Sequence, residues 1–267
     1  QMVTGQLFLM LNNNKIIHNN DLSIHIFVNG FSFCTKSKVD FLPRNNEILD
    51  FKPAFDEFIN YYPKKNFRAI SIVHFSHPST FVPQTLYDIS HKEKYLSHYK
   101  SNSQDDIFIH DILKESKKVN VYSYPKEIEL ILETNKNNYQ EIHYNSLLYN
   151  LIHKHNLRSE NKTQLYVHLQ KEKVDVFLIK NERLLFNNSF LIKNEDDFLY
   201  YVFFVIEQFE LETNAFEFIF LGKITLFDSY YKAVKIYHEN ISFYEEEIIS
   251  SQAIQNHNAP FLSQYFS

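Results

Sequence analysis

Short runs of alternating hydrophobic and polar residues recur along the chain, and the first lie near the N-terminus. The alternation in residues 22–26 predicts a half-buried strand. Asn29-Gly30 follows, and this dipeptide between strand-like runs indicates a hairpin turn because both turn residues take positive φ. Residues 31–34 are then the return strand, with a third strand expected around 39–42.

A helix and a central strand are expected next. Pro53 favours a helix start, and large apolar residues recur at helical spacing from there to Tyr62. Residues 69–73 form a mostly apolar run, which is typical of a strand covered on both faces of a sheet.

The second half of the chain shows the same order of elements. Strands are expected at 165–169, 174–179 and 183–192, and another at 216–220. A helix over 198–209 lies between the last two, with a capped and acidic N-terminus at 194–197. This helix is apolar nearly all round, so we expect it to be buried on nearly every side. The order hairpin, third strand, helix, strand thus occurs twice, offset by roughly 140 to 150 residues, which suggests an internal duplication.

The segment between the two copies and the segment after them contain further elements. The expected helices are 83–99, 125–134, 146–155 and 225–237, and the expected strands are 119–124 and 241–244. A polar loop is expected over 101–106. The polar stretch 158–162 is the best boundary, so we predict a first subdomain at 1–160 and a second at 161–267. The second would end in a loosely attached polar tail from 245, whose Phe261, Tyr265 and Phe266 are candidates for docking to a partner.

Composition excludes several kinds of site. The 267 residues include three glycines, no two within six residues of each other, so a Walker A loop, a dinucleotide fingerprint and a nucleophile elbow are all ruled out. One cysteine allows no internal disulfide and no zinc site built on several cysteines. The net charge of −5 gives no case for nucleic acid.

The longest apolar run, 198–206, is too short to cross a bilayer, which takes about 20 residues, and residues 7–11 lack the flanks of a signal peptide. We therefore expect a cytoplasmic protein.

Three stretches carry a resemblance to a known family. They are Asp21-Leu22-Ser23-Ile24 leading into Asn29-Gly30-Phe31-Ser32-Phe33; Thr80-Phe81-Val82-Pro83 followed by Leu86-Tyr87; and Leu185-Phe186-Asn187-Asn188-Ser189-Phe190 followed by Asp196-Asp197-Phe198-Leu199-Tyr200-Tyr201 and Glu207-Gln208. Together they resemble the bacterial family catalogued as domain of unknown function 3822. The resemblance runs from about Asp21 to Tyr237. It implies an α/β fold of the actin-like ATPase (ribonuclease H-like) type, with two duplicated hairpin-led β-β-β-α-β subdomains, and no established activity.

The actin-like plan implies where a nucleotide would bind. One hairpin turn in each half grips the phosphates, and a Gly-containing turn in the second half receives the adenosine. By this analogy the first turn is Asn29-Gly30, the second is residues 170–173, and the adenosine turn is Gly222-Lys223. The first turn lacks a carboxylate and the second lacks any glycine. We therefore expect no catalytic residues, no ATP hydrolysis and no resident cofactor, although Mg²⁺-ATP binding stays open.

Other candidate groups have plainer explanations. His74 and His77, like His153 and His155, lack the spacing of the helical zinc motif, so no metal site is expected. Cys34 on its strand is expected to pack in the core. Asp196-Asp197 is either a carboxylate pair or, more simply, the start of a helix, and the lysines at 114, 117 and 118 favour a solvated face over a phosphate patch.

The dense aromatics at 200, 201, 203 and 204 are expected to pack in the core, although some aromatics of the chain could line a partner surface. We predict a degenerate actin-like fold that serves as a scaffold for an unidentified protein partner. The alternative is a nucleotide-binding switch or weak ATPase that uses the cleft between the subdomains.

Overall fold

The computed structural model describes residues 22–27, 30–35, 38–43, 56, 70–75, 78–99, 106–134, 139–158, 162–244 and 257–263. The expected first helix, from Pro53 to Tyr62, falls outside these ranges apart from helical Asp56.

The described part of the first half contains two sheets. The larger has the order β3-β2-β1-β4-β8, built from Leu22–Phe27 (β1), Gly30–Thr35 (β2), Lys38–Pro43 (β3), Ile70–His74 (β4) and Tyr139–His143 (β8). β1 and β2 form the expected antiparallel hairpin, and β4 lies parallel between β1 and β8. The smaller sheet has the order β5-β7-β6, built from Ser79–Pro83 (β5), Asp106–Leu113 (β6) and Lys118–Pro125 (β7).

The described part of the second half contains one five-stranded sheet with the order β11-β10-β9-β12-β13. Its strands are Thr163–Leu169 (β9), Lys173–Lys180 (β10), Arg183–Leu191 (β11), Phe216–Leu221 (β12) and Ile241–Tyr244 (β13). A hairpin and third strand on one side of the first strand, with two parallel strands on the other, thus occur in both larger sheets. The α/β fold class expected from the sequence is confirmed.

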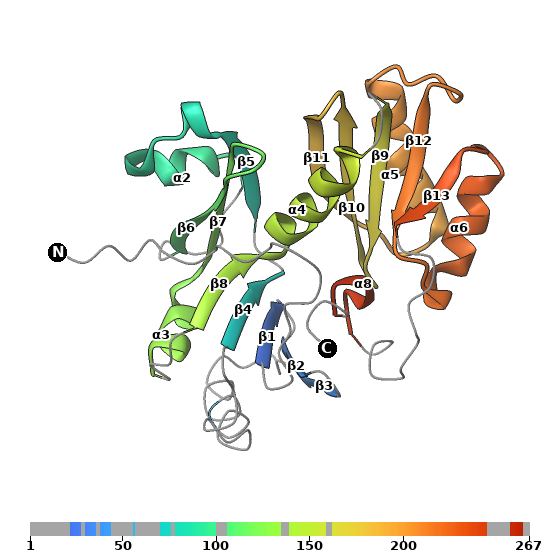
Figure 1. Cartoon of the computed structure of the whole chain (residues 1–267). Helices are drawn as coiled ribbons and strands as arrows, with labels where there is room; N and C mark the ends of the chain where they lie inside the picture. The colour runs from blue at the N-terminus through green and yellow to red at the C-terminus, as the bar shows by residue number, and fades with distance from the viewer. Residues whose placement is uncertain are drawn as a thin grey trace.

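Helices cover these sheets on several sides. They are Lys126–Thr134 (α3), Tyr144–Asn156 (α4), Glu195–Gln208 (α5) and Asp228–Lys235 (α6), with the short helix Pro260–Ser263 (α8) near the C-terminus. Figure 1 shows α4 between the two halves and α5 with α6 on the far side of the second sheet. The main hydrophobic core joins the halves, because Val73 and Phe75 of the first belong to one cluster with α4 and the strands of the second. The predicted boundary near residue 160 stays a prediction.

Three expectations about elements need correction. Residues 83–99 form not one helix but three short ones, Gln84–Leu86 (η3), Ile89–His91 (η4) and Lys92–Tyr95 (α2). Neither β5 nor β8 had a predicted counterpart. β6 was missed because Asp106, assigned to a polar loop, begins a strand whose residues are mostly only partly buried.

The expectation that the second-half helix is buried on nearly every side is wrong. In α5 the buried side chains are Phe198, Val202 and Val205, which form one stripe facing the sheet and α6. Tyr200 is 65% exposed and Phe204 is 45% exposed, so the expected core packing fails for these two. The helix covers one face of its sheet, and nothing in the described part of the chain covers its outer side. Apolar composition alone could not show this.

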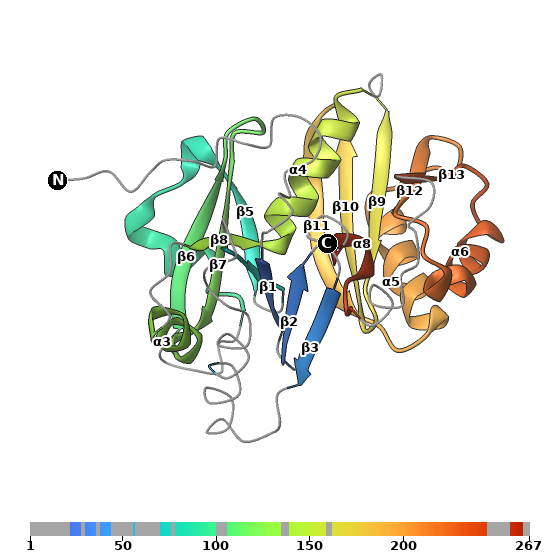
Figure 2. The same cartoon turned by 60° about the horizontal axis from the view of Figure 1, so that its bottom comes forward.

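The C-terminal tail is not loosely attached over residues 257–263. Ala259, Phe261 and Leu262 are fully buried and belong to the main core. Phe261 is therefore not free to dock a partner, whereas Tyr265 and Phe266 lie beyond the described residues. Figures 1 and 2 both show α8 beside β1 and the ends of the second-half strands, at the junction of the halves. Residues 257–263 are called the C-terminal plug below.

Candidate functional site

The first expected phosphate turn is described only in part. Gly30 opens β2 with φ of 150° and pairs with Phe27 across the hairpin. Asn29 lies outside the described residues, so its predicted role stays a prediction. A positive φ of this kind suits glycine, which explains Gly30 by the turn itself.

The expected adenosine turn follows β12 directly. Gly222 has φ of 79° and is buried. The hydroxyl of Tyr231 accepts from the N–H of Ile224 at 3.0 Å and donates to the carbonyl of Gly222 at 3.3 Å, so one side chain closes the turn. Lys223 is exposed, and its ammonium lies 5.7 Å from the centre of the Phe243 ring. Among the described residues, no hydrogen bond or ring contact joins Gly222 or Lys223 to Gly30.

The second expected phosphate turn is bonded to its own chain. The N–H of Gln170 donates to the carbonyl of Lys173 at 2.8 Å and closes the β9–β10 hairpin. The N–H of Lys171 donates to the carbonyl of Asn258 in the C-terminal plug at 3.0 Å. The carbonyl of Glu172 accepts from the N–H of Ile192 at 3.0 Å. Two backbone donors of this turn, the N–H groups of Gln170 and Lys171, are therefore already used within the chain.

Lys173 ties this turn to the first half. Its ammonium donates to the carbonyl of Phe75 at 3.1 Å and to the hydroxyl of Tyr144 at 2.9 Å. Burial lowers the pKa of Lys173, and the negative charge of Asp175 opposes that shift. The cation is therefore held by a strand end of the first half and by the start of α4.

Asp175 is the centre of a buried polar cluster. It is fully buried and accepts four hydrogen bonds, from Tyr144 Oη (2.7 Å), Ser189 Oγ (2.5 Å), His168 Nδ1 (2.8 Å) and Gln170 Nε2 (2.7 Å). Burial alone pushes the pKa of Asp175 upward. The Lys173 ammonium and the hydrogen bonds outweigh burial, so the pKa lies well below its usual range and the carboxylate is ionised.

His168 and Asp175 face each other across paired strands and have the arrangement of a base oriented by a carboxylate. In a neutral ring that donates from Nδ1, Nε2 carries a lone pair. That Nε2 is buried with no hydrogen-bond partner, and the ring lies 5.8 Å from the ring of Phe261 in the C-terminal plug. The plug thus keeps this base away from water and from any substrate. A polar residue within the apolar part of each of two neighbouring strands was the signal in the sequence that could have revealed the pair.

A second carboxylate, which is partly buried, lies in the first half. Asp111 accepts hydrogen bonds from the N–H of His143 at 2.9 Å, from Ser146 Oγ at 2.6 Å and from Tyr122 Oη at 3.4 Å. Burial raises the pKa of Asp111 to about 7. This carboxyl group joins β6 and β7 to the start of α4, and it was not singled out from the sequence.

The earlier candidates have structural roles. Cys34 is buried in β2, as expected. Asn194 caps α5 by accepting from the N–H of Asp197 at 2.9 Å, and Asp197 accepts from the N–H of Lys193 at 3.0 Å, so the cap explains the acidic pair. The structure also brings together three possible metal ligands, His25, Cys34 and His257, although no metal site was expected from spacing.

Comparison with known proteins agrees with this fold. The sequence profile described as "Protein of unknown function (DUF3822)" matches residues 11–241. The chain belongs to the DUF3822 family. No curated protein sequence matches this member of the family.

Two solved structures show the fold of this DUF3822 chain. One is a Bacteroides thetaiotaomicron protein described as having an actin-like ATPase fold and unknown function, with a TM-score of 0.71, 18% identity, and coverage of 93% of this chain and 96% of that one. The other comes from the PilM-PilN type IV pilus biogenesis complex, with a TM-score of 0.54, 9% identity, and coverage of 92% and 97%. At these identities they show an actin-like ATPase fold and no more. In the described residues, no helix is long and apolar enough to span a membrane.

Proposed function

We propose that this protein is a cytoplasmic, non-catalytic scaffold of actin-like fold that works by binding another protein. The observation that carries the proposal is the hydrogen bond from the Lys171 N–H to the Asn258 carbonyl. It commits the second phosphate turn to the C-terminal plug. A phosphate would have to break this bond and displace buried apolar side chains before it could reach the turn.

The polar groups beside that turn are also engaged. The Lys173 ammonium, which could otherwise neutralise a phosphate, is held by Phe75 and Tyr144. Asp175, which could otherwise help to organise Mg²⁺, is surrounded by four hydrogen-bond donors. A carboxylate satisfied in this way gains little from a metal ion. These contacts support a structural role for the cleft.

Exposed aromatic side chains on the outer side of α5 favour the hypothesis that this surface binds a protein partner. Tyr200 and Phe204 stack with ring centres 6.3 Å apart, and the ring centres of Phe203 and Tyr237 lie 5.4 Å apart. Tyr200, Phe204 and Tyr237 are 65%, 45% and 60% exposed. Exposed aromatic side chains that lie together are enriched at protein interfaces. We call these four residues the α5 surface.

The PilM structure offers a precedent, since it is described as part of a complex with PilN and the two chains share a fold. It supports the idea that such a fold can serve an assembly. It does not identify the partner of this chain.

Site-specific photo-crosslinking tests the partner. A benzophenone amino acid placed at Tyr200 or Phe204 is expected to give one discrete adduct in the native cells. Tyr99 is the matched control, because it is 45% exposed but lies in the first half. The proposal fails if none of the positions gives an adduct, or if position 99 gives the same adduct as position 204.

Thermal unfolding with millimolar Mg²⁺-ATP tests the cleft. A ligand at about 100 times its Kd stabilises a protein by roughly 2.7 kcal/mol, which is on the order of 5 to 10 °C for a chain of this size. We expect no shift. A shift of that size that is lost in Lys223→Glu, where an exposed side chain changes, would instead support the nucleotide-binding switch.

A further inference from the structure

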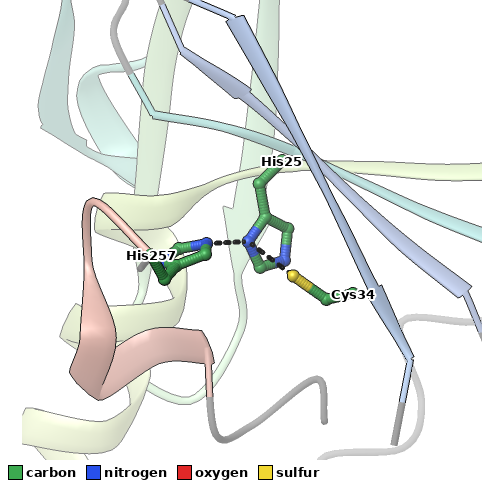
Figure 3. Close-up of side chains that lie close together, drawn as sticks. All are labelled: His25, Cys34 and His257. Atoms are coloured by element: carbon green, nitrogen blue, oxygen red, sulfur yellow. Dashed lines mark hydrogen bonds between the residues drawn. The ribbon is translucent and has the colours of Figure 1, made fainter. Parts of the chain in front are cut away.

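Three side chains from distant parts of the sequence converge at the base of the C-terminal plug. His25 lies on β1, Cys34 on the paired strand β2, and His257 begins the plug. All three are fully buried. His257 Nε2 lies 2.8 Å from His25 Nδ1, and Cys34 Sγ lies 3.6 Å from the same nitrogen (Figure 3). The three ligand atoms lie within 4.8 Å of one another.

The proton positions in the ion-free cluster follow from its hydrogen bonds. The N–H of Ala259 donates to His257 Nδ1 at 2.9 Å, so the proton of a neutral His257 ring is on Nε2 and points at His25 Nδ1. His25 then carries its own proton on Nε2, towards Ser23 Oγ at 2.8 Å. The Cys34 thiol points at the same His25 Nδ1. Two donors therefore compete for one lone pair, whereas a cation at that point would satisfy all three residues.

The surroundings of the cluster are largely aromatic. The rings of Phe27 and Phe75 lie 5.4 and 5.8 Å from the ring of His257, and Phe75 lies 5.1 Å from His25. All three side chains are fully buried, and a net charge is costly in such a place. Two charged side chains of opposite sign interact electrostatically with the cluster. The Asp40 carboxylate interacts with the Cys34 thiol, and the Lys171 ammonium interacts with the His257 ring.

The three ligand types and their burial decide which metal ion would fit this cluster. One thiolate and two imidazoles suit copper and zinc. Structural zinc takes four ligands, whereas this group in the described residues supplies three. A monovalent ion with one thiolate is neutral, whereas Zn²⁺ would leave one positive charge buried, which is costly. We propose that His25, Cys34 and His257 form a three-coordinate binding site for Cu(I).

Binding requires a small rearrangement and no electron transfer. Metal bonds of about 2.0 to 2.3 Å place trigonal ligand atoms about 3.5 to 3.8 Å apart. The distance from Cys34 Sγ to His25 Nδ1 already fits, whereas the two imidazole nitrogens must separate by about 0.7 Å. The thiol proton leaves to solvent, and the His257 proton moves from Nε2 to Nδ1 at the expense of the bond from Ala259. One proton is released for each ion bound.

Such an ion would fasten the C-terminal plug to the first hairpin. His257 belongs to the plug, and His25 and Cys34 belong to β1 and β2. An ion that binds only when the plug is seated stabilises the seated state by mass action. This inference is independent of the proposed protein partner.

Titration of the full-length reduced protein with Cu(I), without oxygen and against a chromophoric Cu(I) chelator, tests the site. We expect one ion per chain, a thiolate-to-copper absorption in the ultraviolet, and a higher unfolding temperature. Cys34→Ser and His257→Gln are each expected to weaken binding at least 100-fold, and circular dichroism checks that each variant is folded. His91→Gln is the matched control, because His91 lies on the surface and bonds Asp88, and it should bind as the wild type does. The two variants test the site separately, so a fold lost in one leaves the other decisive.

Two results would overturn the proposal. The first is the absence of a one-to-one complex with Cu(I), or a complex that forms equally well in folded Cys34→Ser and His257→Gln chains. The second is Zn²⁺ displacing bound Cu(I) at equal concentration, which would show that the ion was wrongly assigned.

Discussion

The N–H of Lys171 donates a hydrogen bond to the carbonyl of Asn258 at 3.0 Å, although the two residues lie 87 positions apart in the sequence. This bond joins the turn of the second hairpin to the C-terminal plug. The plug continues as Ala259, Phe261 and Leu262, which are fully buried in the core shared by both halves. The C-terminal segment therefore covers the turn that the sequence analysis predicts to be the second phosphate turn.

Truncation of Phe261 tests whether the plug is part of the folded core. Phe261→Ala removes a fully buried ring and is expected to lower the free energy of unfolding by about 3 to 5 kcal/mol. Ile236→Ala is the control, since Ile236 is 77% exposed and its loss should change stability by less than about 0.5 kcal/mol. Urea unfolding measures both. Equal and small effects of the two changes would mean that the plug is a loose tail after all.

The Lys173–Asp175 pair predicts a strong and coupled effect on stability. Lys173 and Asp175 are linked through the Tyr144 hydroxyl, which accepts from the Lys173 ammonium and donates to the Asp175 carboxylate. Asp175→Asn removes a fully buried charge that accepts four hydrogen bonds and should cost about 3 to 5 kcal/mol. Lys173→Met in the same chain should recover part of that loss, because the unpaired charge is then gone. Lys180→Met, at the exposed end of β10, controls for loss of a lysine. A double-mutant cycle by urea unfolding measures the coupling, and a coupling near zero would contradict this account.

Asp111 predicts a pH dependence whose sign can be worked out. Its pKa is raised from an ordinary 3.8 to about 7 in the folded chain. Between these values the folded state holds a proton that the unfolded state has lost. This contribution to stability is full below about pH 4 and is lost as pH rises through about 7, by at most about 1.4 kcal/mol per pH unit.

Asp111→Asn isolates this contribution, since an amide resembles the protonated carboxyl. The stability of the variant relative to the wild type should rise between pH 5 and pH 8 in urea unfolding. Opposite contributions from His25 and His257, whose lowered pKa values favour the folded state above about pH 6.5, cancel because both chains carry them. Glu141 and Tyr122, which face Asp111, also remain in both chains. A difference that does not change with pH would show that Asp111 is ionised when folded.

Local periodicity in the sequence accounts for most of the described fold. The alternation around β1 and β9, the turn at Gly30 and the cap at Asn194 each depend on neighbours in the chain, so these elements could be predicted. The strands β5, β6 and β8 were missed. The burial of α5 could not. Composition shows how apolar a helix is, and only the packing of α5 on one sheet face decides that Phe198 is buried and Tyr200 exposed.

The candidate sites depend on contacts that no local pattern shows. His25 and His257 are 232 residues apart, and neither stands in a recognisable motif. The sequence of the C-terminal plug was interpreted as a loosely attached tail because its residues are mostly small, polar or aromatic. Its apolar side chains are buried only against strands that are far away in the sequence. His168 and Asp175 are the exception, because each interrupts an apolar strand and their pairing follows from the hairpin register.

Hydrogen exchange at the Lys171 amide, followed by NMR with and without millimolar Mg²⁺-ATP, tests the central claim most directly. If the C-terminal plug occupies the second phosphate turn, this amide exchanges far more slowly than that of Asn181 in the β10–β11 turn, and Mg²⁺-ATP leaves its rate unchanged. An unprotected Lys171 amide that becomes protected when Mg²⁺-ATP is added would contradict the account and would show that the turn still binds nucleotide.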